Sequence, residues 1–301
     1  MLSFRPSTGR LKQWVFPAFA LLALVVSSDP GHAAKSGEFL NAVVGVEANV
    51  PNEARTAQTL GTFREGSGAV ISEDGLILTI GYLILEAMSV DVVLQDGRRV
   101  GADIVAYDHD TGFGLVRAQE TLDVQPLELG DSALLSTGKQ ALVATRNGPS
   151  DAQGAYVVSR RDFAGSWEYL LENAIFTSPP HRGFGGAALL GPDGRLLGIG
   201  SLFVANSVAQ NKVLPGNMFV PIDQLKPILT ELVEKGRRQG PVRPWLGVYP
   251  QSVRGHVILD RIARGGPADT AGLRANDLVI AVNGKDVTDV AAFYRALWSS
   301  G

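Results

Sequence analysis

The chain has 301 residues, no cysteine, a net charge of −3 and 45% hydrophobic residues. Its length allows two domains with a sizeable core, and its hydrophobic content excludes a disordered chain. The lack of cysteine excludes disulfides and thiolate metal sites, and the acidic balance argues against binding to nucleic acid or to a lipid surface. The four histidines lack metal-ligand spacing, so we expect no metal and no cofactor: His32, His109, His181 and His256.

The N-terminus is typical of an export signal. Arg5, Arg10 and Lys12 precede a short apolar run, Trp14–Val26, and the small residues at 31–34 offer a cleavage site. The apolar run is short for a transmembrane helix. We therefore expect an exported, periplasmic protein, with an uncleaved membrane anchor as the alternative.

Short β-rich runs separated by turn residues dominate the chain after this segment. Asp74-Gly75 and Asp96-Gly97 each lie between two such runs, which is a strong hairpin signal. With 35 glycines, the pattern predicts a turn-rich, mainly β protein, and the polar stretch 51–62 predicts a loop. The predicted strands cover residues 42–48, 69–72, 76–79, 90–94, 100–105, 156–160, 169–171, 174–176 and 218–221.

The last third of the chain changes character. A predicted helix with Asp223 near its start stops at Gly236, and a Pro/Gly linker, 240–244, follows. Beyond the linker come the sequence WLGV, a strand HVILDRI, the segment GGPADTAGLRANDLVIAVNG and a helix near 290–298.

The stretch Gly183–Gly200, GFGGAALLGPDGRLLGIG, resembles the serine loop of trypsin-like proteases of the HtrA/Deg type, whose pattern is G-N-S-G-G-P-L-L-x-x-D-G. In this resemblance, Gly183 falls on the oxyanion glycine and Gly185 on the nucleophilic serine. The segment 66–87 resembles the one that carries the general-base histidine, and that position holds Tyr82. The segment DHDTGFGLVR resembles the one with the orienting aspartate, which falls on Gly112.

These three substitutions predict a protease fold without its chemistry. A serine protease needs a hydroxyl nucleophile, an imidazole base and a carboxylate that orients the imidazole. Gly185 and Gly112 have no side chain, and a tyrosine with an ordinary pKa near ~10 is a poor base at neutral pH. Two uses of the serine loop stay open: the N–H groups of Gly183 and Gly185 form an anion-binding nest, or the glycines only maintain a tight turn.

Two other sets of residues are candidates to replace the triad. Ser178 and His181 are close in sequence, but no aspartate is placed to orient the histidine. Asp108, His109 and Asp110 look like a relay, yet consecutive loop residues point in different directions, so we expect a solvated turn. Neither set is predicted to rescue catalysis.

Residues 245–301 resemble a PDZ domain, a module whose x-h-G-h loop receives the terminal carboxylate of a peptide. Trp245, Leu246, Gly247 and Val248 match that loop, although WLGV also reads as a buried strand. The resemblance implies that a peptide adds as a strand beside the last helix, with the following residues on or near the groove: Ala291, Ala292 and Arg295. A PDZ domain normally closes with one more strand, so we expect an incomplete domain or a fragment.

Together, these features predict a mainly β chain: a trypsin-like double β-barrel followed by a small α+β PDZ-like domain. The expected boundaries are a signal peptide at 1–34, a protease-like domain at 35–239 and a PDZ-like domain at 240–301. The expected function is a catalytically inactive homologue that binds peptides or unfolded proteins through free C-termini, without nucleic acid. The alternatives are an active endopeptidase with displaced residues and a structural subunit of a hetero-oligomer; the resemblance also implies trimers.

Overall fold

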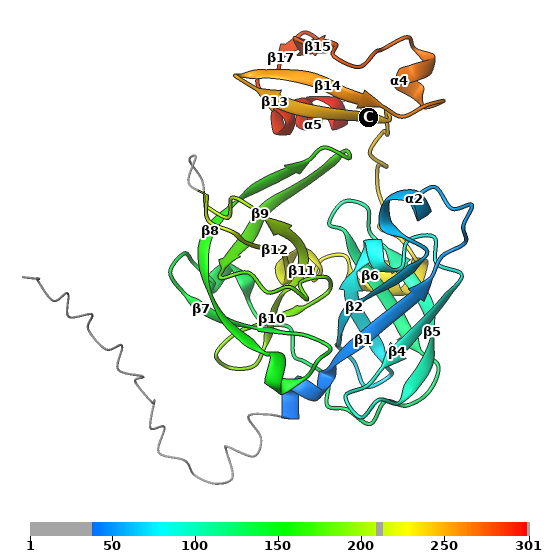
Figure 1. Ribbon diagram of the computed structural model, residues 1–301, viewed down its shortest axis with the longest axis vertical. Helices are drawn as coiled ribbons and strands as arrows, with labels where there is room; N and C mark the ends of the chain where they lie inside the picture. Colours follow the sequence, from blue (N-terminus) through cyan, green and yellow to red (C-terminus); the bar gives the residue numbers. More distant parts are fainter. Residues whose placement is uncertain (1–37, 209–212, 300–301) are drawn as a thin grey trace, which may run out of the picture.

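The computed structural model describes residues 38–208 and 213–299, and Figure 1 shows two β-barrels side by side with a smaller unit above them. The export signal expected at 1–34 lies outside the described residues. In the described part of the chain, no helix combines the length and the apolar character that a membrane crossing needs. The mainly β architecture that the sequence predicts is confirmed.

The first barrel is closed in the strand order β1-β2-β3-β6-β5-β4. The Asp-Gly turns lie between β2 and β3 and between β4 and β5, as predicted. The polar stretch 51–62 is not entirely loop, because it contains the short helix α2 (Ala57–Leu60). The strands are β1 (Val43–Asn49), β2 (Phe63–Val70), β3 (Leu76–Ile80), β4 (Ser89–Val93), β5 (Arg99–Tyr107) and β6 (Phe113–Ala118).

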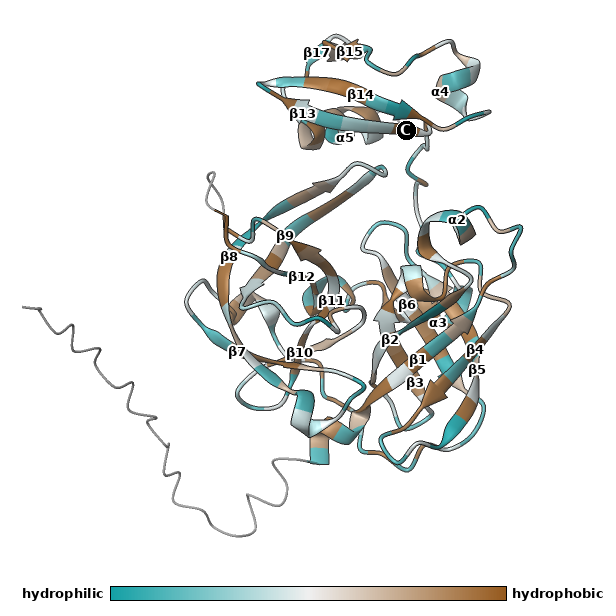
Figure 2. Cartoon of the chain, viewed as in Figure 1, coloured by the Kyte–Doolittle hydropathy of each residue, from teal (hydrophilic) through white to brown (hydrophobic). Residues whose placement is uncertain are grey.

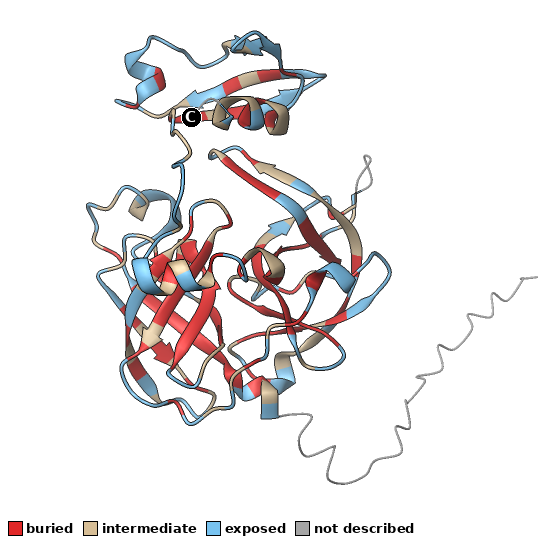
Figure 3. Ribbon diagram, turned by 180° about the vertical axis from the view of Figure 1, so that it is seen from behind, coloured by how far each residue is buried: buried red, intermediate tan, exposed pale blue. Residues whose placement is uncertain are grey.

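The second barrel is closed in the order β10-β11-β12-β9-β8-β7. Hydrophobic side chains gather on the strands of both barrels, and the barrel interiors are buried (Figures 2 and 3). Burial of this apolar surface is the main force that closes each barrel. The strands are β7 (Gln140–Ala144), β8 (Gln153–Gly165), β9 (Tyr169–Ser178), β10 (Ala188–Leu190), β11 (Leu196–Val204) and β12 (Gly216–Pro221).

The sequence predicts three short strands in the region of β8 and β9, but the structure has two long strands that form one hairpin. It is one long ribbon that pairs from Tyr156 opposite Ser178 to Gly165 opposite Tyr169, with the register shifting after Val157 and after Arg161. The polar residues that interrupt the apolar pattern bond across the ribbon instead of ending it: Asn173 accepts from the Arg160 guanidinium at 3.2 Å and donates its N–H to an Asp162 carboxylate oxygen at 3.0 Å. Polar cross-strand pairs can therefore continue a hairpin that periodicity alone divides.

The segment after β12 also differs from its prediction. Helix α3 (Leu229–Lys235) begins six residues after Asp223, because Pro227 cannot lie inside a helix. Asp223 lies instead in a 3-10 turn (Ile222–Gln224), where its carboxylate accepts from the Ser132 hydroxyl at 2.7 Å. The stop is as predicted, with Gly236 in the left-handed region.

The small C-terminal unit combines two short sheets with two helices. One sheet has the order β13-β14-β15, and the other pairs β16 with β17. Its core includes Tyr294, which is fully buried, and Leu170 from the second barrel packs in the same cluster. The elements are β13 (Val248–Val253), β14 (His256–Ile262), α4 (Pro267–Thr270), β15 (Leu278–Val279), β16 (Ala281–Val282), β17 (Lys285–Asp286) and α5 (Val290–Trp298).

Candidate functional sites

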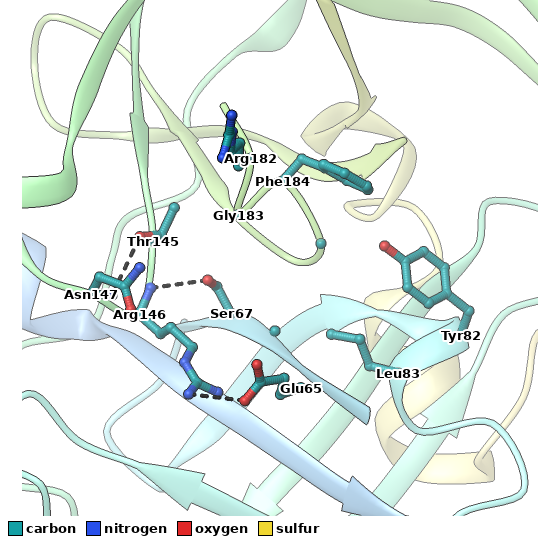
Figure 4. Close-up of a pocket in the computed structure, with 12 residues that line it drawn as sticks. Glu65, Ser67, Tyr82, Leu83, Thr145, Arg146, Asn147, Arg182, Gly183 and Phe184 are labelled. Atoms are coloured by element: carbon teal, nitrogen blue, oxygen red, sulfur yellow. Dashed lines mark hydrogen bonds and ion pairs between the residues drawn. The ribbon is translucent and has the colours of Figure 1, made fainter. Parts of the chain in front are cut away.

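A cavity of about 350 Å³ lies between the two barrels. Figure 4 shows Tyr82 on one wall, with its hydroxyl directed toward the loop that carries Gly183 and Phe184 on the other. The lining residues come from β2, from the turn after β3, from the loop after β7 and from the loop before β10: Glu65–Ser67, Tyr82, Leu83, Thr145–Asn147 and Arg182–Gly185.

The Tyr82 side chain fills the place that a residue larger than glycine would need at position 185. A Cβ built on Gly185 would lie 2.9 Å from the Tyr82 hydroxyl oxygen, closer than van der Waals contact allows. The hydroxyl donates to the Ser201 carbonyl at 3.0 Å. Burial raises the Tyr82 pKa, so the side chain stays neutral and cannot act as a base.

Gly112 adjoins the same wall, because its carbonyl accepts from the N–H of Gly81 at 2.7 Å. Its φ of 83° lies in the left-handed region that disfavours a side chain. Tyr169 of β9 donates its hydroxyl to the Thr111 carbonyl at 2.6 Å, and that hydroxyl would lie 3.4 Å from a Cβ on Gly112. The structure thus brings the three sequence-predicted positions together, and tyrosines occupy the space beside two of them.

The sequence left two uses of the serine loop open, an anion-binding nest and a tight turn. The Gly183 N–H donates to Nδ1 of His181 at 3.0 Å and is therefore committed within its own loop. The Gly185 carbonyl accepts from the Ser67 N–H at 2.8 Å, which joins the loop to the first barrel. These contacts favour the interpretation that the glycines shape a turn.

The expectation that no aspartate lies near His181 is wrong. The His181 Nε2 is 3.5 Å from an Asp151 carboxylate oxygen and 3.0 Å from the Asp151 carbonyl. Because Nδ1 accepts from Gly183, Nε2 carries the proton and donates to Asp151. Ser178 donates to the Pro215 carbonyl at 3.0 Å rather than to the histidine. The buried imidazole therefore has structural partners on both nitrogens.

Two hydroxyls that line the cavity, those of Thr145 and Ser67, also have other partners. Thr145 donates to the Asp151 carboxylate at 2.5 Å. Figure 4 shows the second contact, in which Ser67 accepts the Arg146 N–H at 3.0 Å. The hydrogen bond from Thr145, followed by that from Asn147, lowers the pKa of Asp151. A carboxylate with a lowered pKa is a weak base, so it activates Thr145 poorly.

We expected a solvated turn at Asp108, but this aspartate is buried and both aspartates of the turn are paired. Asp108 is buried and accepts from the Thr111 hydroxyl at 2.6 Å and from the Arg238 guanidinium at 3.0 Å. Asp110 pairs with Arg243 at 3.2 Å, whereas His109 lies edge-on against Tyr107. The aspartates thus hold the chain that leads to the C-terminal unit and form no relay.

The carboxylate loop, residues 245–248, presents three successive main-chain N–H groups. Those of Leu246, Gly247 and Val248 converge on the side chain of Glu168, at 2.9, 2.5 and 2.9 Å. Gly247 has a φ of 77°, and a Cβ there would lie 3.1 Å from the Ala263 Cβ, so the loop needs glycine. Trp245 remains half exposed at the junction.

Glu168 is the functional residue that sequence reasoning missed. It lies at the tip of β8–β9, at least 78 residues before the loop that it contacts. No motif surrounds it. The available signal was a charged residue in a hairpin tip between two aromatic residues, Trp167 and Tyr169, and that signal names no partner.

Elsewhere, the described residues contain no group of three or more His, Asp or Glu side chains placed to hold a metal ion. The site must therefore be understood from its hydroxyls, its main-chain N–H groups and its ion pairs.

Comparison with known proteins places the two regions in families. Residues 66–199 match the trypsin-like peptidase domain model, and residues 258–301 match a PDZ domain model. The chain is 26% identical to "Serine protease Do-like HtrA" of Lactobacillus helveticus over 80% of this chain and 63% of that protein. It is 28% identical to "Probable periplasmic serine endoprotease DegP-like" of Bartonella henselae over 75% of this chain and 46% of that protein.

Solved structures agree in fold. "HtrA-type protease AlgW with decapeptide" superimposes with a TM-score of 0.54 at 19% identity, covering 88% of this chain and 89% of that one. "HtrA-type protease AlgW with tripeptide" gives 0.54 at 19% identity, covering 87% and 86%. The chain spans 63% and 46% of the length of the two curated relatives above.

Proposed function

Because the chain belongs to the HtrA/Deg-type family of trypsin-like proteases with a PDZ domain, we propose that it is a catalytically inactive member that binds peptides or unfolded proteins. The proposed division is a protease-like domain up to residue 239 and a PDZ-like domain from residue 240. The word periplasmic in the name of the Bartonella henselae relative supports export to the cell envelope.

The observation that carries the inactive reading is the contact at Gly185. The residue at this position has no nucleophile, and the Tyr82 hydroxyl lies only 2.9 Å from the place that a Cβ would take. A covalent acyl-enzyme needs a nucleophilic side chain with a base in reach. Tyr82 is neutral and donates a hydrogen bond to the Ser201 carbonyl. The cleft therefore offers neither a nucleophile nor a base at these positions.

An active endopeptidase with displaced residues has less support. His181 is the histidine nearest the serine-loop glycines in sequence, and it bonds to Asp151 and to the Gly183 N–H. Its imidazole would have to break one of these bonds before it took a proton from a hydroxyl. The hydroxyls of Ser67, Thr145 and Ser178 all have other partners.

Peptide binding is assigned to the carboxylate loop. Three N–H groups in one loop form a concave donor set that suits a carboxylate, and they already hold one in this structure. The N–H groups belong to the main chain, so the loop keeps its chemistry although the protease cleft has lost its side chains. The ligand class is a peptide with a free C-terminus.

The test compares labelled peptides that have apolar C-termini with their amidated twins, by fluorescence anisotropy on the whole chain. Hydrogen bonds to a charged group contribute roughly 1.5–3 kcal/mol each. Since tenfold in affinity is about 1.4 kcal/mol, amidation should weaken binding at least tenfold. Equal binding of the two forms would rule out the loop as a carboxylate site.

A further inference from the structure

The carboxylate loop is occupied by the chain itself. One Glu168 oxygen accepts from the N–H of Leu246 at 2.9 Å, and the other accepts from Gly247 and Val248 at 2.5 and 2.9 Å. A carboxylate bound through both oxygens by three main-chain donors has the chemistry of a peptide C-terminus in such a loop. Glu168 therefore occupies the position that an external ligand would need.

The hairpin tip around Glu168 is docked on the C-terminal unit at several points. The fully buried Tyr294 of α5 donates its hydroxyl to the Gly165 carbonyl at 2.7 Å and accepts from the Glu168 N–H at 3.0 Å. Arg295 forms an ion pair with Asp162 of β8. Figure 1 shows the β8–β9 ribbon reaching up to β13 and α5, where these contacts form.

The backbone of Glu168 indicates that this arrangement is specific. Its φ is 59°, in the left-handed region that glycine and asparagine tolerate better than glutamate does. Pairing of Gly165 with Tyr169 leaves a three-residue tip, and a residue in this conformation is expected at its end. The chain has a strained glutamate there, and the carboxylate contacts offset that strain.

We propose that Glu168 is an internal ligand of the carboxylate loop and that a peptide C-terminus binds only by displacing it. The peptide half of this inference rests on the proposed function. The competitor is an extended peptide that ends in a free carboxylate, because the loop offers hydrogen bonds to such a group. Displacement would also release the hairpin tip from the loop.

The decisive variant is Glu168→Asn in the whole chain, with Glu172→Gln as its control. Asparagine tolerates the left-handed conformation, so the tip keeps its turn, but its side chain is shorter and uncharged. Glu172 lies on the same hairpin, with its side chain 68% exposed and 3.8 Å from Arg295. The substitution Glu172→Gln therefore removes the same charge at a position away from the loop. Glu168→Gln keeps the length of the side chain and should act in the same direction with a smaller effect.

Two measurements are made on each variant: amide exchange at Leu246, Gly247 and Val248, and anisotropy with free and amidated peptides. Glu168→Asn should speed hydrogen exchange at the three amides. It should also tighten the binding of the free peptide at least tenfold, because the loop no longer holds a carboxylate of the chain. The amidated peptide should bind as it does to the parent chain. Glu172→Gln should change neither measurement.

The outcomes separate the internal ligand from the peptide function. Unchanged amide exchange in Glu168→Asn overturns the internal ligand, and so does equal tightening in Glu168→Asn and Glu172→Gln, which would be a general charge effect. Faster exchange combined with equal binding of free and amidated peptides supports the contact of Glu168 with the loop but removes the proposed peptide function.

Discussion

The cleft between the barrels and the carboxylate loop each contain a side chain of the chain itself, Tyr82 in the cleft and Glu168 at the loop, but they differ in what their chemistry requires. The cleft needs three side chains, and the positions that match them hold Tyr82, Gly112 and Gly185. The loop needs only main-chain N–H groups in one conformation, and Gly247 provides that conformation. Side-chain chemistry is lost by single substitutions, whereas a main-chain site persists while its turn persists.

The occupants also differ. Tyr82 is partly buried and neutral, its ring packs against the hydrophobic core, and its hydroxyl donates a hydrogen bond to the Ser201 carbonyl. Glu168 is half-buried at a hairpin tip, and it is bound by the kind of contact that a peptide carboxylate could replace. We therefore expect Tyr82 to stay in its place in the cleft and Glu168 to be displaced from the loop by competition.

The largest effect on peptide binding should come from Gly247→Glu, which disturbs the backbone conformation of the loop. A glutamate at this position has to adopt a positive backbone φ, which costs roughly 1–2 kcal/mol. Its negative charge would also repel both Glu168 and an incoming peptide carboxylate. Binding of the free peptide should weaken by more than tenfold, as measured by anisotropy. An unchanged affinity would show that the peptide binds elsewhere.

A smaller effect is expected in the cleft from Tyr82→Phe. The change removes the bond to the Ser201 carbonyl and should lower the free energy of unfolding by about 1 kcal/mol, as measured by urea denaturation. Tyr156→Phe is the control, because its half-exposed hydroxyl accepts from Gln140 at 2.7 Å where water can replace it. Equal losses in the two variants would show that the Tyr82 contact is not a buried one.

The Asp151 carboxylate should give a still smaller, pH-dependent effect. Its hydrogen bonds lower its folded pKa below the unfolded value of about 3.9. Its contribution to stability is therefore complete above that unfolded value and is lost as the pH falls through the folded pKa. Acid unfolding should be less steep in Asp151→Asn. Identical acid profiles would mean that the hydrogen bonds from Thr145 and Asn147 to Asp151 do not stabilise the fold.

The smallest effect is expected from restoring the triad. Tyr82→His, Gly112→Asp and Gly185→Ser together should give almost no hydrolysis of casein. The new aspartate must adopt the left-handed conformation and lies against the Tyr169 hydroxyl, whereas catalytic groups need placement within about 0.5 Å. Robust turnover by this variant would show that the cleft is still arranged for catalysis.

Much of the architecture could be predicted from local signals. Asp-Gly turns and β-rich runs located the hairpins of the first barrel, and α5 has the bounds expected for the last helix. The resemblance to the HtrA/Deg family also pointed to positions 82, 112 and 185, which the fold brings together. These features depend on residues that are near in sequence or on a known pattern.

The features that sequence reasoning missed depend on long-range contacts. Asp108 looked solvated because its partner Arg238 is 130 residues away, and His181 looked unpaired because Asp151 is 30 residues away. The hairpin β8–β9 looked discontinuous because its polar pairs are visible only after the strands are aligned. Glu168 could not be assigned for the same reason, since its donors belong to another unit.

The most direct test of the account is whether the chain forms an acyl-enzyme. The purified chain is incubated with unfolded casein and, separately, with a fluorophosphonate probe that labels activated serines. We expect no casein fragments and no labelled serine, because position 185 has no nucleophile and the Tyr82 hydroxyl keeps its proton. Covalent labelling of any serine, with casein turnover abolished by that label, would contradict this expectation.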